Sequence, residues 1–270
     1  MDYDAVLAAL PQTLRDAGAP GFQVFPGFTE ASVAKAIRED VTAIARDAAK
    51  GVDVSPALVV PENQALFEIN PEDVISKIFR LHRRPIFIEF LKDPRVIELV
   101  VASIGEDVDC FLSQFIFKNS GARGQPWHQD SYYFPFEPLR PIIGIWLAIT
   151  EATLENGCLH ILPGSQSEGI KEHVPDRRIN ANNGYVEIID HDMSGSQACL
   201  LQPGDLMVFD SHLMHRSTDN VSAGVRAAMV WHFARAGTED PGVLRQGKRL
   251  PNPVNDWMPY LRAGRVNIVA

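Results

Sequence analysis

The sequence predicts an α+β protein in which N-terminal helices precede a β-barrel or double-sheet jelly roll. Apolar side chains recur at helical spacing through the first hundred residues, whereas from about residue 108 they occur in short strand-like segments. Pairs such as Asn156-Gly157 and Pro163-Gly164 separate those segments and are typical turn signals. Many short strands between turns are typical of barrels and jelly rolls, and helices followed by strands indicate an α+β layer arrangement.

The domain organisation is predicted from the length of the chain and from its uniform composition. Its 270 residues are enough for one large domain with a sizeable core. The chain shows no internal repeat, low-complexity segment or flexible linker, so we expect a single domain over residues 1–270. Within it, residues 1–105 would form a mainly helical supporting layer, 106–235 the jelly-roll core, and 236–270 a C-terminal extension.

Two helical segments are expected in the supporting layer. The first follows Thr29 as its cap and closes at Gly51, because apolar side chains recur with helical spacing between them. The second extends from about residue 72 to 104 and is interrupted by Pro85 and Pro94. The apolar positions of the first segment are Val33, Ile37, Val41, Ile44 and Ala48.

Strands are expected wherever short apolar or alternating segments lie between turn signals. The alternation within residues 142–149 gives one face of Ile and Leu side chains, which would pack on the helical layer. The other face combines Gly144 and Ala148 with Trp146, which leaves room for a ligand, although plain core packing of Trp146 is an alternative. The predicted strands span residues 111–118, 142–149, 159–162, 185–189, 198–202, 206–209 and 226–233.

Composition and charge exclude several classes of protein. The formal net charge is −9 and the isoelectric point is about 5.4, which argues against a general nucleic-acid binder. No stretch approaches the roughly 20 apolar residues that a membrane span needs, and the first residues have no basic, apolar pattern of a secretory signal. The three cysteines are far apart, so neither a disulfide framework nor a thiolate zinc site is indicated. A cytoplasmic protein is therefore expected.

The pattern His128-Gln129-Asp130 is a candidate metal motif. On a strand, residues i and i+2 project from the same face about 7 Å apart, so an imidazole and a carboxylate could converge on one ion. Since the chain has 8 His and 34 Asp and Glu, about one such pair is expected by chance, and the motif alone is weak. His215, just after a predicted strand, is the candidate third ligand. Two histidines and one carboxylate form the facial triad of non-haem iron(II) oxygenases.

Arg226 strengthens the metal interpretation. It begins a strand whose alternation places Arg226, Ala228, Val230 and His232 on one face. An arginine on that face needs an anionic partner, because a buried unpaired charge is costly. A dicarboxylate co-substrate would satisfy it through bidentate hydrogen bonds, and an ordinary salt bridge is the alternative.

Other polar residues allow more than one interpretation. His212 lies three residues before His215, and near a strand end the two would point to opposite faces, so His215 is favoured as the ligand. His160 and His232 could line the cavity or be hydrogen-bonded core histidines. The polar stretch 168–183 could form a substrate lid or a solvated loop.

Taken together, these segments resemble the phytanoyl-CoA dioxygenase (PhyH) family of iron- and 2-oxoglutarate-dependent oxygenases. The resemblance is greatest to the members called phytanoyl-CoA dioxygenase domain-containing proteins. The resemblance extends from about Lys77 to Phe233, more than half of the chain. It implies a double-stranded β-helix, a jelly-roll barrel related to cupins, behind the N-terminal helices. The matching motifs are residues 113–118, 126–130, 144–149, 152–159, Pro163-Gly164-Ser165, Pro203-Gly204-Asp205, His215 and Arg226.

The resemblance also implies residue roles. His128, Asp130 and His215 match the iron(II) ligands, and oxygenation is expected because halogenating relatives lack the carboxylate ligand. Among the remaining positions, Arg226 matches the arginine that binds the distal carboxylate of 2-oxoglutarate. Ser217 matches a hydroxyl beside it, Trp146 an aromatic residue of the co-substrate pocket, Lys77 a lysine near 2-oxoglutarate, and Gln114 a variable co-substrate contact.

The expected function is hydroxylation, or another oxidation, of an unactivated C–H bond with O2 and 2-oxoglutarate, releasing succinate and CO2. The substrate would be a small molecule, such as a natural-product intermediate or an acyl derivative, and the oligomeric state is open. Two rivals remain at this point. One is a non-catalytic barrel with a vestigial metal site, and the other is a cupin-like metal-binding protein that does not use 2-oxoglutarate.

Overall fold

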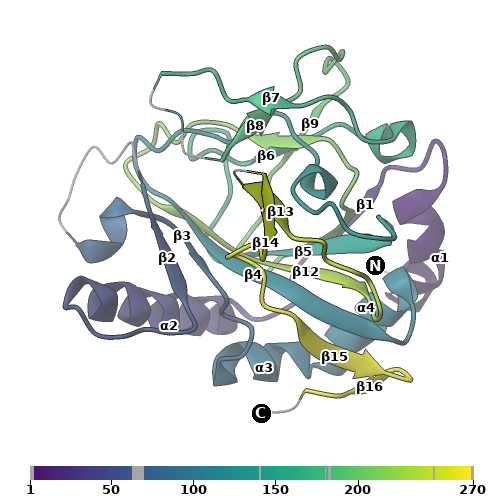
Figure 1. Cartoon of the computed structure of the whole chain (residues 1–270), viewed down its shortest axis with the longest axis horizontal. Coiled ribbons are helices and arrows are strands. Elements are labelled where there is room, and N and C mark those ends of the chain that lie inside the picture. The colour runs from purple at the N-terminus through teal and green to yellow at the C-terminus, as the bar shows by residue number, and fades with distance from the viewer. Residues whose placement is uncertain are drawn as a thin grey trace.

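The computed structural model describes residues 3–62, 70–139, 141–179, 181, 184–245 and 247–268. A large antiparallel sheet forms the centre of the molecule, with helices α2 and α3 below it and the strands β6 to β9 above it (Figure 1). These layers match the predicted α+β class, and the two facing sheets are those of a double-stranded β-helix.

Helices occur mainly in the first 105 residues, as predicted. The helix expected after Thr29 is α2, which begins one residue later than expected because Glu30 is its N-cap residue. Pro85 and Pro94 interrupt the second helical segment by starting new helices, a position that proline favours. The helices are α1 (Tyr3–Arg15), α2 (Ala31–Ala49), α3 (Pro85–Leu91) and α4 (Pro94–Ile104), with 3-10 turns η1 (Pro71–Val74), η2 (Asp130–Tyr132) and η3 (Ser165–Glu168).

The large sheet has the strand order β1-β10-β5-β12-β4-β15-β16, and β3 joins its side by pairing with β4 and β2. A smaller sheet has the order β11-β6-β9, and β7-β8 and β13-β14 form two-stranded ribbons. The strands are β1 (Phe22–Phe25), β2 (Leu58–Pro61), β3 (Ile75–Phe79), β4 (Val108–Lys118), β5 (Ile142–Ala148), β6 (Leu159–Ile161), β7 (Val174–Pro175), β8 (Val186–Glu187), β9 (Gln197–Cys199), β10 (Leu206–Asp210), β11 (His215–Ser217), β12 (Arg226–Arg235), β13 (Val243–Arg245), β14 (Lys248–Leu250), β15 (Met258–Arg262) and β16 (Arg265–Val266).

The expectation that residues 72–84 are helical was wrong. Residues 75–79 form β3, which pairs with β4 and places Lys77 opposite Ile116. Four of its five side chains are buried, so the strand is covered on both faces and lacks a clear alternation of apolar and polar residues. β1 and β2 are likewise strands within the segment expected to be mainly helical, and β1 pairs with β10 at the edge of the large sheet.

The two faces of the large sheet bury different cores. Ile143, Ile145 and Leu147 of β5 pack in a core shared with the helices, as their alternation predicted. Trp146 and Ala148, from the opposite face, pack with residues of the smaller sheet. Each layer of the protein therefore buries one face of β5.

The C-terminal segment is built into the large sheet. β15 pairs with β4, and the Tyr260 hydroxyl donates a hydrogen bond to the Leu91 carbonyl. Upstream of β15, Arg83 forms a bidentate ion pair with Asp256. Among the helices of the described residues, none combines the length and the apolar character that crossing a bilayer requires.

Candidate metal centre

The metal motif lies between the two sheets rather than within a regular strand. The backbones of His128 and His215 form an isolated antiparallel bridge, with N–H to carbonyl distances of 2.9 and 3.0 Å. Gln129 has extended backbone, and Asp130 begins the 3-10 turn η2. The expected strand through His128 and Asp130 is thus replaced by one bridge and one turn, and this arrangement still turns both side chains toward His215.

The three predicted ligands converge. One ligand atom from each of His128, Asp130 and His215 lies within 4.8 Å of the other two. Nε2 of His128 is 3.5 Å and Nε2 of His215 is 3.7 Å from Oδ1 of Asp130. The two histidines are less than 10% exposed. Two imidazoles and a carboxylate around one point are a donor set for iron(II), the facial arrangement that leaves further coordination positions for other ligands.

Both histidines present the correct nitrogen to a metal. Nδ1 of His128 lies 2.7 Å from the Pro126 carbonyl, and Nδ1 of His215 lies 2.9 Å from the Leu213 carbonyl. A carbonyl only accepts, so each Nδ1 carries the proton and Nε2 keeps its lone pair. Such outer partners fix the tautomer and orientation of ligating histidines.

The protonation states agree with metal binding. Burial, reinforced by the neighbouring His128, lowers the pKa of His215 to about 4, so its ring is neutral at physiological pH. Burial alone would raise the pKa of Asp130, but the facing imidazoles of His215, His232 and His128 outweigh it and hold that pKa well below its usual range. A neutral imidazole and an ionised carboxylate are the forms that bind a divalent ion.

A third histidine, His232, holds the carboxylate. Its Nε2 lies 2.7 Å from Oδ2 of Asp130, which leaves Oδ1 toward His128 and His215. The alternation of β12 had placed His232 on the same face as Arg226, so the signal was present in the sequence. Of the two roles that the sequence allows for His232, cavity lining and a hydrogen-bonded core histidine, the structure adds the hydrogen bond to the ligand carboxylate.

The middle residue of the motif points away from the metal ligands. The Gln129 side chain donates to the Gly169 and His212 carbonyls and accepts from the Lys171 backbone N–H. Gln129 thereby attaches the start of the 168–183 stretch to the metal motif, and Tyr132 stacks on His173 in the same stretch. Part of that stretch, including Asn180, lies outside the described residues.

Arg226 lies in the core of the site with part of its guanidinium unused. It is 1% exposed, and its Nε and Nη2 donate to the Gly157 carbonyl at 3.2 and 2.9 Å. Its Nη1 has no hydrogen-bond partner within the described structure. Burial lowers the pKa of Arg226 to about 10, so it stays charged at neutral pH. The ordinary salt bridge considered as an alternative is not formed with any described carboxylate.

The strand register places the other predicted co-substrate residues on the same inner face as Arg226. Trp146 pairs with Val230 of β12, which in turn pairs with Gln114 of β4. The Trp146 ring lies 5.8 Å from the Arg226 guanidinium, and its Nε1 has no partner among the described residues. Lys77 enters from β3 and reaches the Gln125 side chain at 3.5 Å. The co-substrate roles of these residues stay predictions.

Ser217 lies at the end of β11, two residues after His215, and contacts Lys118, which the sequence motifs do not mark as a site residue. Its Oγ accepts a hydrogen bond of 2.7 Å from Nζ of Lys118, the last residue of β4. Lys118 is buried and lies directly opposite Arg226 in the sheet. Its position at the end of a predicted strand, in step with Gln114 and Ile116, was the available signal.

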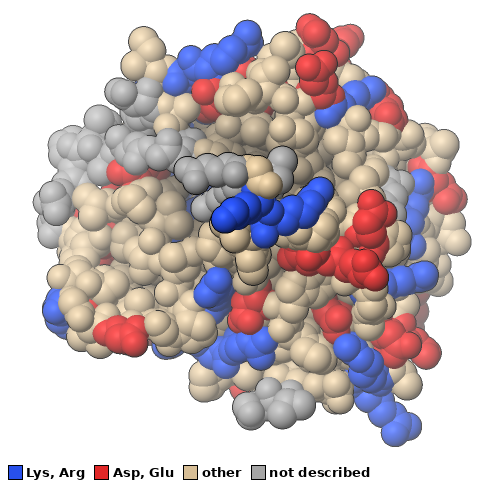
Figure 2. All heavy atoms as spheres, viewed as in Figure 1, with Lys and Arg blue, Asp and Glu red and all other residues tan. Residues whose placement is uncertain are grey.

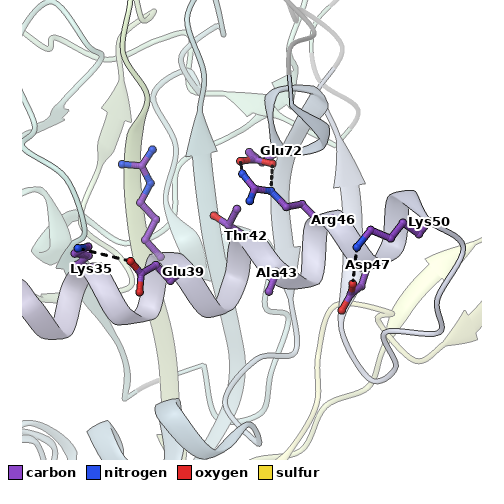
Figure 3. Close-up of a pocket in the computed structure, with 9 residues that line it drawn as sticks. Lys35, Glu39, Thr42, Ala43, Arg46, Asp47, Lys50 and Glu72 are labelled. Carbon is purple, nitrogen blue, oxygen red and sulfur yellow. Dashed lines mark hydrogen bonds and ion pairs between the residues drawn. The ribbon is translucent and has the colours of Figure 1, made fainter.

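Other candidates fall outside this cluster. His212 is not part of the metal cluster formed by the described residues. A hollow of about 550 Å³ lies along the outer side of α2 (Figure 3), where Arg46, Lys35 and Lys50 each pair with a carboxylate. Three of the four basic residues that line it are thus paired with carboxylates, and it offers no donor set comparable to the metal cluster. The face shown in Figure 2 carries basic and acidic side chains close together.

The buried polar groups fit a bound metal and a bound anion. Three ligand atoms face one point, and beside them a charged guanidinium retains an unused N–H edge. A buried cation with an unsatisfied donor is costly unless an anion completes it. Residues His128, Asp130 and His215 could hold iron(II), and Arg226 could bind a carboxylate of 2-oxoglutarate.

Comparison with protein families and curated proteins gives one consistent result. Residues 19–228 match the family model described as phytanoyl-CoA dioxygenase (PhyH). The chain is 28% identical to "Phytanoyl-CoA dioxygenase, peroxisomal" of Bos taurus over 80% of this chain and 66% of the relative. It is 30% identical to "Phytanoyl-CoA dioxygenase domain-containing protein 1" of Rattus norvegicus over 63% of this chain and 60% of the relative. The chain thus spans about two thirds or less of the length of these two curated relatives.

Solved structures share the fold. EctD from S. alaskensis, solved with 2-oxoglutarate and 5-hydroxyectoine, has a TM-score of 0.69 at 20% identity, covering 97% of this chain and 86% of EctD. The epimerase SnoN from nogalamycin biosynthesis, described as non-haem and α-ketoglutarate-dependent, has a TM-score of 0.61 at 15% identity, covering 94% of this chain and 99% of SnoN. At these identities the likeness establishes the architecture.

Proposed function

The chain belongs to the phytanoyl-CoA dioxygenase (PhyH) family, and from this premise we propose that it is a dioxygenase that oxidises an unactivated C–H bond of a small organic molecule. The family match covers well over half of the chain and confirms the resemblance inferred from the sequence motifs. The family consists of Fe(II)/2-oxoglutarate-dependent oxygenases, so its metal is iron(II) and its co-substrate is 2-oxoglutarate. Hydroxylation with release of succinate and CO2 is the reaction that we propose for this chain.

The single observation that carries the proposal is the pairing of a facial ligand set with an incompletely satisfied buried arginine. His128, Asp130 and His215 supply the ligand set, and Arg226 supplies the N–H edge that a distal carboxylate would occupy. A metal site alone would fit either rival function. The charged, buried arginine beside it favours a co-substrate that carries a carboxylate.

Each residue has a defined part in the proposed reaction. When bound, iron(II) and 2-oxoglutarate supply the capacity to activate O2 for C–H oxidation. His128, Asp130 and His215 hold the metal on one side, while His232 orients the Asp130 carboxylate. Arg226 binds the distal carboxylate, with Ser217 beside it, and Trp146 with Gln114 and Lys77 completes the co-substrate pocket. Burial of the three histidines, Arg226 and Trp146 excludes water around them, which strengthens each charge interaction.

The substrate is proposed to be a small molecule, either a natural-product intermediate or an acyl derivative. SnoN comes from nogalamycin biosynthesis and EctD was solved with 5-hydroxyectoine, whereas the curated relatives are named for phytanoyl-CoA, an acyl-CoA. A screen should therefore contain both acyl-CoA esters and small metabolites, with succinate formation as the readout.

The decisive experiment measures 2-oxoglutarate decarboxylation and binding with matched variants. The iron-loaded protein should release CO2 from 2-oxoglutarate, and metal plus 2-oxoglutarate should raise its melting temperature. Asp130→Ala should abolish the metal-dependent increase, whereas the exposed-site variant Lys92→Met should retain it. A protein that binds metal but neither binds nor decarboxylates 2-oxoglutarate would support a cupin-like metal-binding protein. Binding of both without any turnover would support a non-catalytic barrel.

A cytoplasmic location is proposed as well. The cysteines Cys110, Cys158 and Cys199 are all free and buried, which fits a reducing compartment. Some relatives carry the word peroxisomal in their names, so a peroxisomal location is the alternative. Cell fractionation with markers for both compartments distinguishes the two.

A further inference from the structure

Two buried cations lie side by side next to the metal centre. Lys118 and Arg226 are directly paired across β4 and β12, and they are 4% and 1% exposed. Neither forms an ion pair with a described carboxylate. Burying two basic side chains next to each other with no carboxylate in direct contact is unfavourable, so the pair points to a role in binding an anion.

Lys118 has two acceptors, and both belong to the strand end that carries Ser217. Its Nζ donates to Oγ of Ser217 at 2.7 Å and to the Thr218 carbonyl at 2.6 Å. Burial, followed by the charge of Arg226, lowers the pKa of Lys118 well below its usual value. The Thr218 carbonyl only accepts, so Nζ donates to it in either protonation state, and the protonated amine donates to Ser217 as well.

The contacts of Ser217 leave its hydroxyl group one further role, that of a hydrogen-bond donor. Its Oγ also accepts a hydrogen bond of 3.0 Å from the backbone N–H of Gln125. A hydroxyl oxygen has two acceptor positions, and Lys118 and Gln125 fill both. The hydroxyl proton must then be donated to a third group.

Gly157 lies between Arg226 and the strand end that carries Ser217, and its lack of a side chain allows close packing there. Its carbonyl accepts from Arg226, and a Cβ at this position would lie 2.4 Å from the Thr218 carbonyl oxygen and 2.6 Å from Cδ of Lys118. Side chains larger than hydrogen are excluded there, and the positive φ of 83° also favours glycine. Arg226 Nη1 lacks a partner among the described residues. Lys118, opposite Arg226 in the sheet, links it to the Ser217 hydroxyl, whose proton is free for a further acceptor once Lys118 and Gln125 fill both acceptor positions.

We propose that Lys118 is a positioning residue that holds the Ser217 hydroxyl as a donor toward the carboxylate bound by Arg226. The inference rests on the proposed function, because that carboxylate would be the distal one of 2-oxoglutarate. Lys118 acts through Ser217 and need not touch the co-substrate. Without its amine, Oγ of Ser217 regains an acceptor position and the Thr218 carbonyl loses its donor, so the hydroxyl is no longer committed to the co-substrate.

The test is a double-mutant cycle read by co-substrate binding rather than by turnover. Nickel(II)-loaded wild type, Lys118→Met, Ser217→Ala and the double variant are titrated with 2-oxoglutarate in a calorimeter. Each single variant should bind about tenfold more weakly, as expected for one lost hydrogen bond to a charged group. The double variant should bind no more weakly than the single variants, because both remove the same hydrogen bond.

Three controls and one further variant of Lys118 make the result specific. 2-Oxobutyrate lacks the distal carboxylate, so its affinity should be equal in all four proteins. Nickel(II) affinity should also be unchanged, and Lys92→Met, on the surface at the end of α3, should behave as wild type throughout. Lys118→Gln keeps an N–H donor, so it should retain more affinity for 2-oxoglutarate than Lys118→Met. If Lys118→Met does not fold, Lys118→Gln and Ser217→Ala together test whether Lys118 acts through Ser217.

The possible outcomes separate the inference from the proposed function. Wild-type affinity in both Lys118 variants would overturn the inference and leave the proposed function intact. Equal losses for 2-oxoglutarate and 2-oxobutyrate would overturn it too, since they would indicate general damage. Additive losses in the double variant would exclude action through Ser217. A wild-type protein that binds nickel(II) but not 2-oxoglutarate would overturn both proposals.

Discussion

His232 Nε2 lies 2.7 Å from Oδ2 of Asp130, so a histidine of the large sheet holds the carboxylate that faces the two predicted histidine ligands. This contact joins β12 to the η2 turn through two residues that are 102 positions apart in the chain. The same strand also carries Arg226, six residues earlier and on the same face. One strand therefore orients both the proposed metal ligand and the proposed co-substrate.

Replacing His232 by leucine should weaken metal binding about 10- to 100-fold, as removal of an outer partner of a metal ligand usually does. The leucine fills similar space but cannot donate to Asp130, so the carboxylate is free to rotate. Calorimetric titration with nickel(II) measures the effect. His160→Leu, on the smaller sheet and outside the cluster, is the control, and equal affinities in both variants would contradict the role assigned to His232.

Replacing Arg226 by methionine should separate co-substrate binding from stability. The variant loses the increase in melting temperature that 2-oxoglutarate gives to the metal-loaded protein, because the distal carboxylate has no guanidinium to bind. The melting temperature of the ligand-free variant should stay within a few degrees of wild type, since an incompletely paired buried charge contributes little to stability. Thermal unfolding with and without 2-oxoglutarate checks both statements, and a retained 2-oxoglutarate response would refute the first.

Gly144→Ala should damage the metal centre by overpacking. A Cβ at Gly144 would lie 2.2 Å from the Phe209 ring, which packs against His215 with ring centroids 5.5 Å apart. We expect a loss of about 1–3 kcal/mol in the free energy of unfolding together with weaker metal binding. Urea unfolding and nickel(II) titration measure the two effects. Gly224→Ala is the matched control, because a Cβ there meets no atom within 4 Å.

Asp256→Asn should destabilise the protein at neutral pH but not in acid. Partial burial would raise the pKa of Asp256, but the facing His82 and Arg83 outweigh it and hold that pKa well below its usual range. A depressed folded-state pKa gives stability that is complete above the unfolded-state pKa of about 3.9 and is lost as the pH falls further. Urea unfolding at pH 7 should show a loss of about 2 kcal/mol that shrinks below about pH 4. A difference that does not change with pH would exclude this electrostatic origin.

The sequence predicted those features that depend on regular alternation or on rare residue types. The two faces of β5 were assigned correctly, because Ile and Leu alternate there with Gly, Trp and Ala. The convergence of His128, Asp130 and His215 was also expected, although Asp130 lies in a turn rather than in a strand. Their role as iron ligands, the roles of the co-substrate residues and the single-domain organisation stay predictions.

Features that depend on long-range packing could not be predicted in the same way. The segment Ile75–Phe79 is buried on both faces, and its apolar spacing fits a helix as well as a strand, so β3 was missed. In the sequence Lys118 is a charged residue at the end of a strand, and only the structure shows that it is buried, opposite Arg226 and in contact with Ser217. The partner of His232 is a hundred residues away, and sequence alternation gives a face but not a contact.

The backbone bridge between His128 and His215 has a practical consequence. Because these two residues are already hydrogen-bonded to each other, the distance between them is set by the β-structure and not by an ion. Chelation should therefore empty the centre without unfolding the chain, and the apoprotein should be reloadable with a redox-inert or spectroscopically visible ion. Loss of iron by oxidation would then inactivate the protein reversibly and would not lead to its unfolding and degradation.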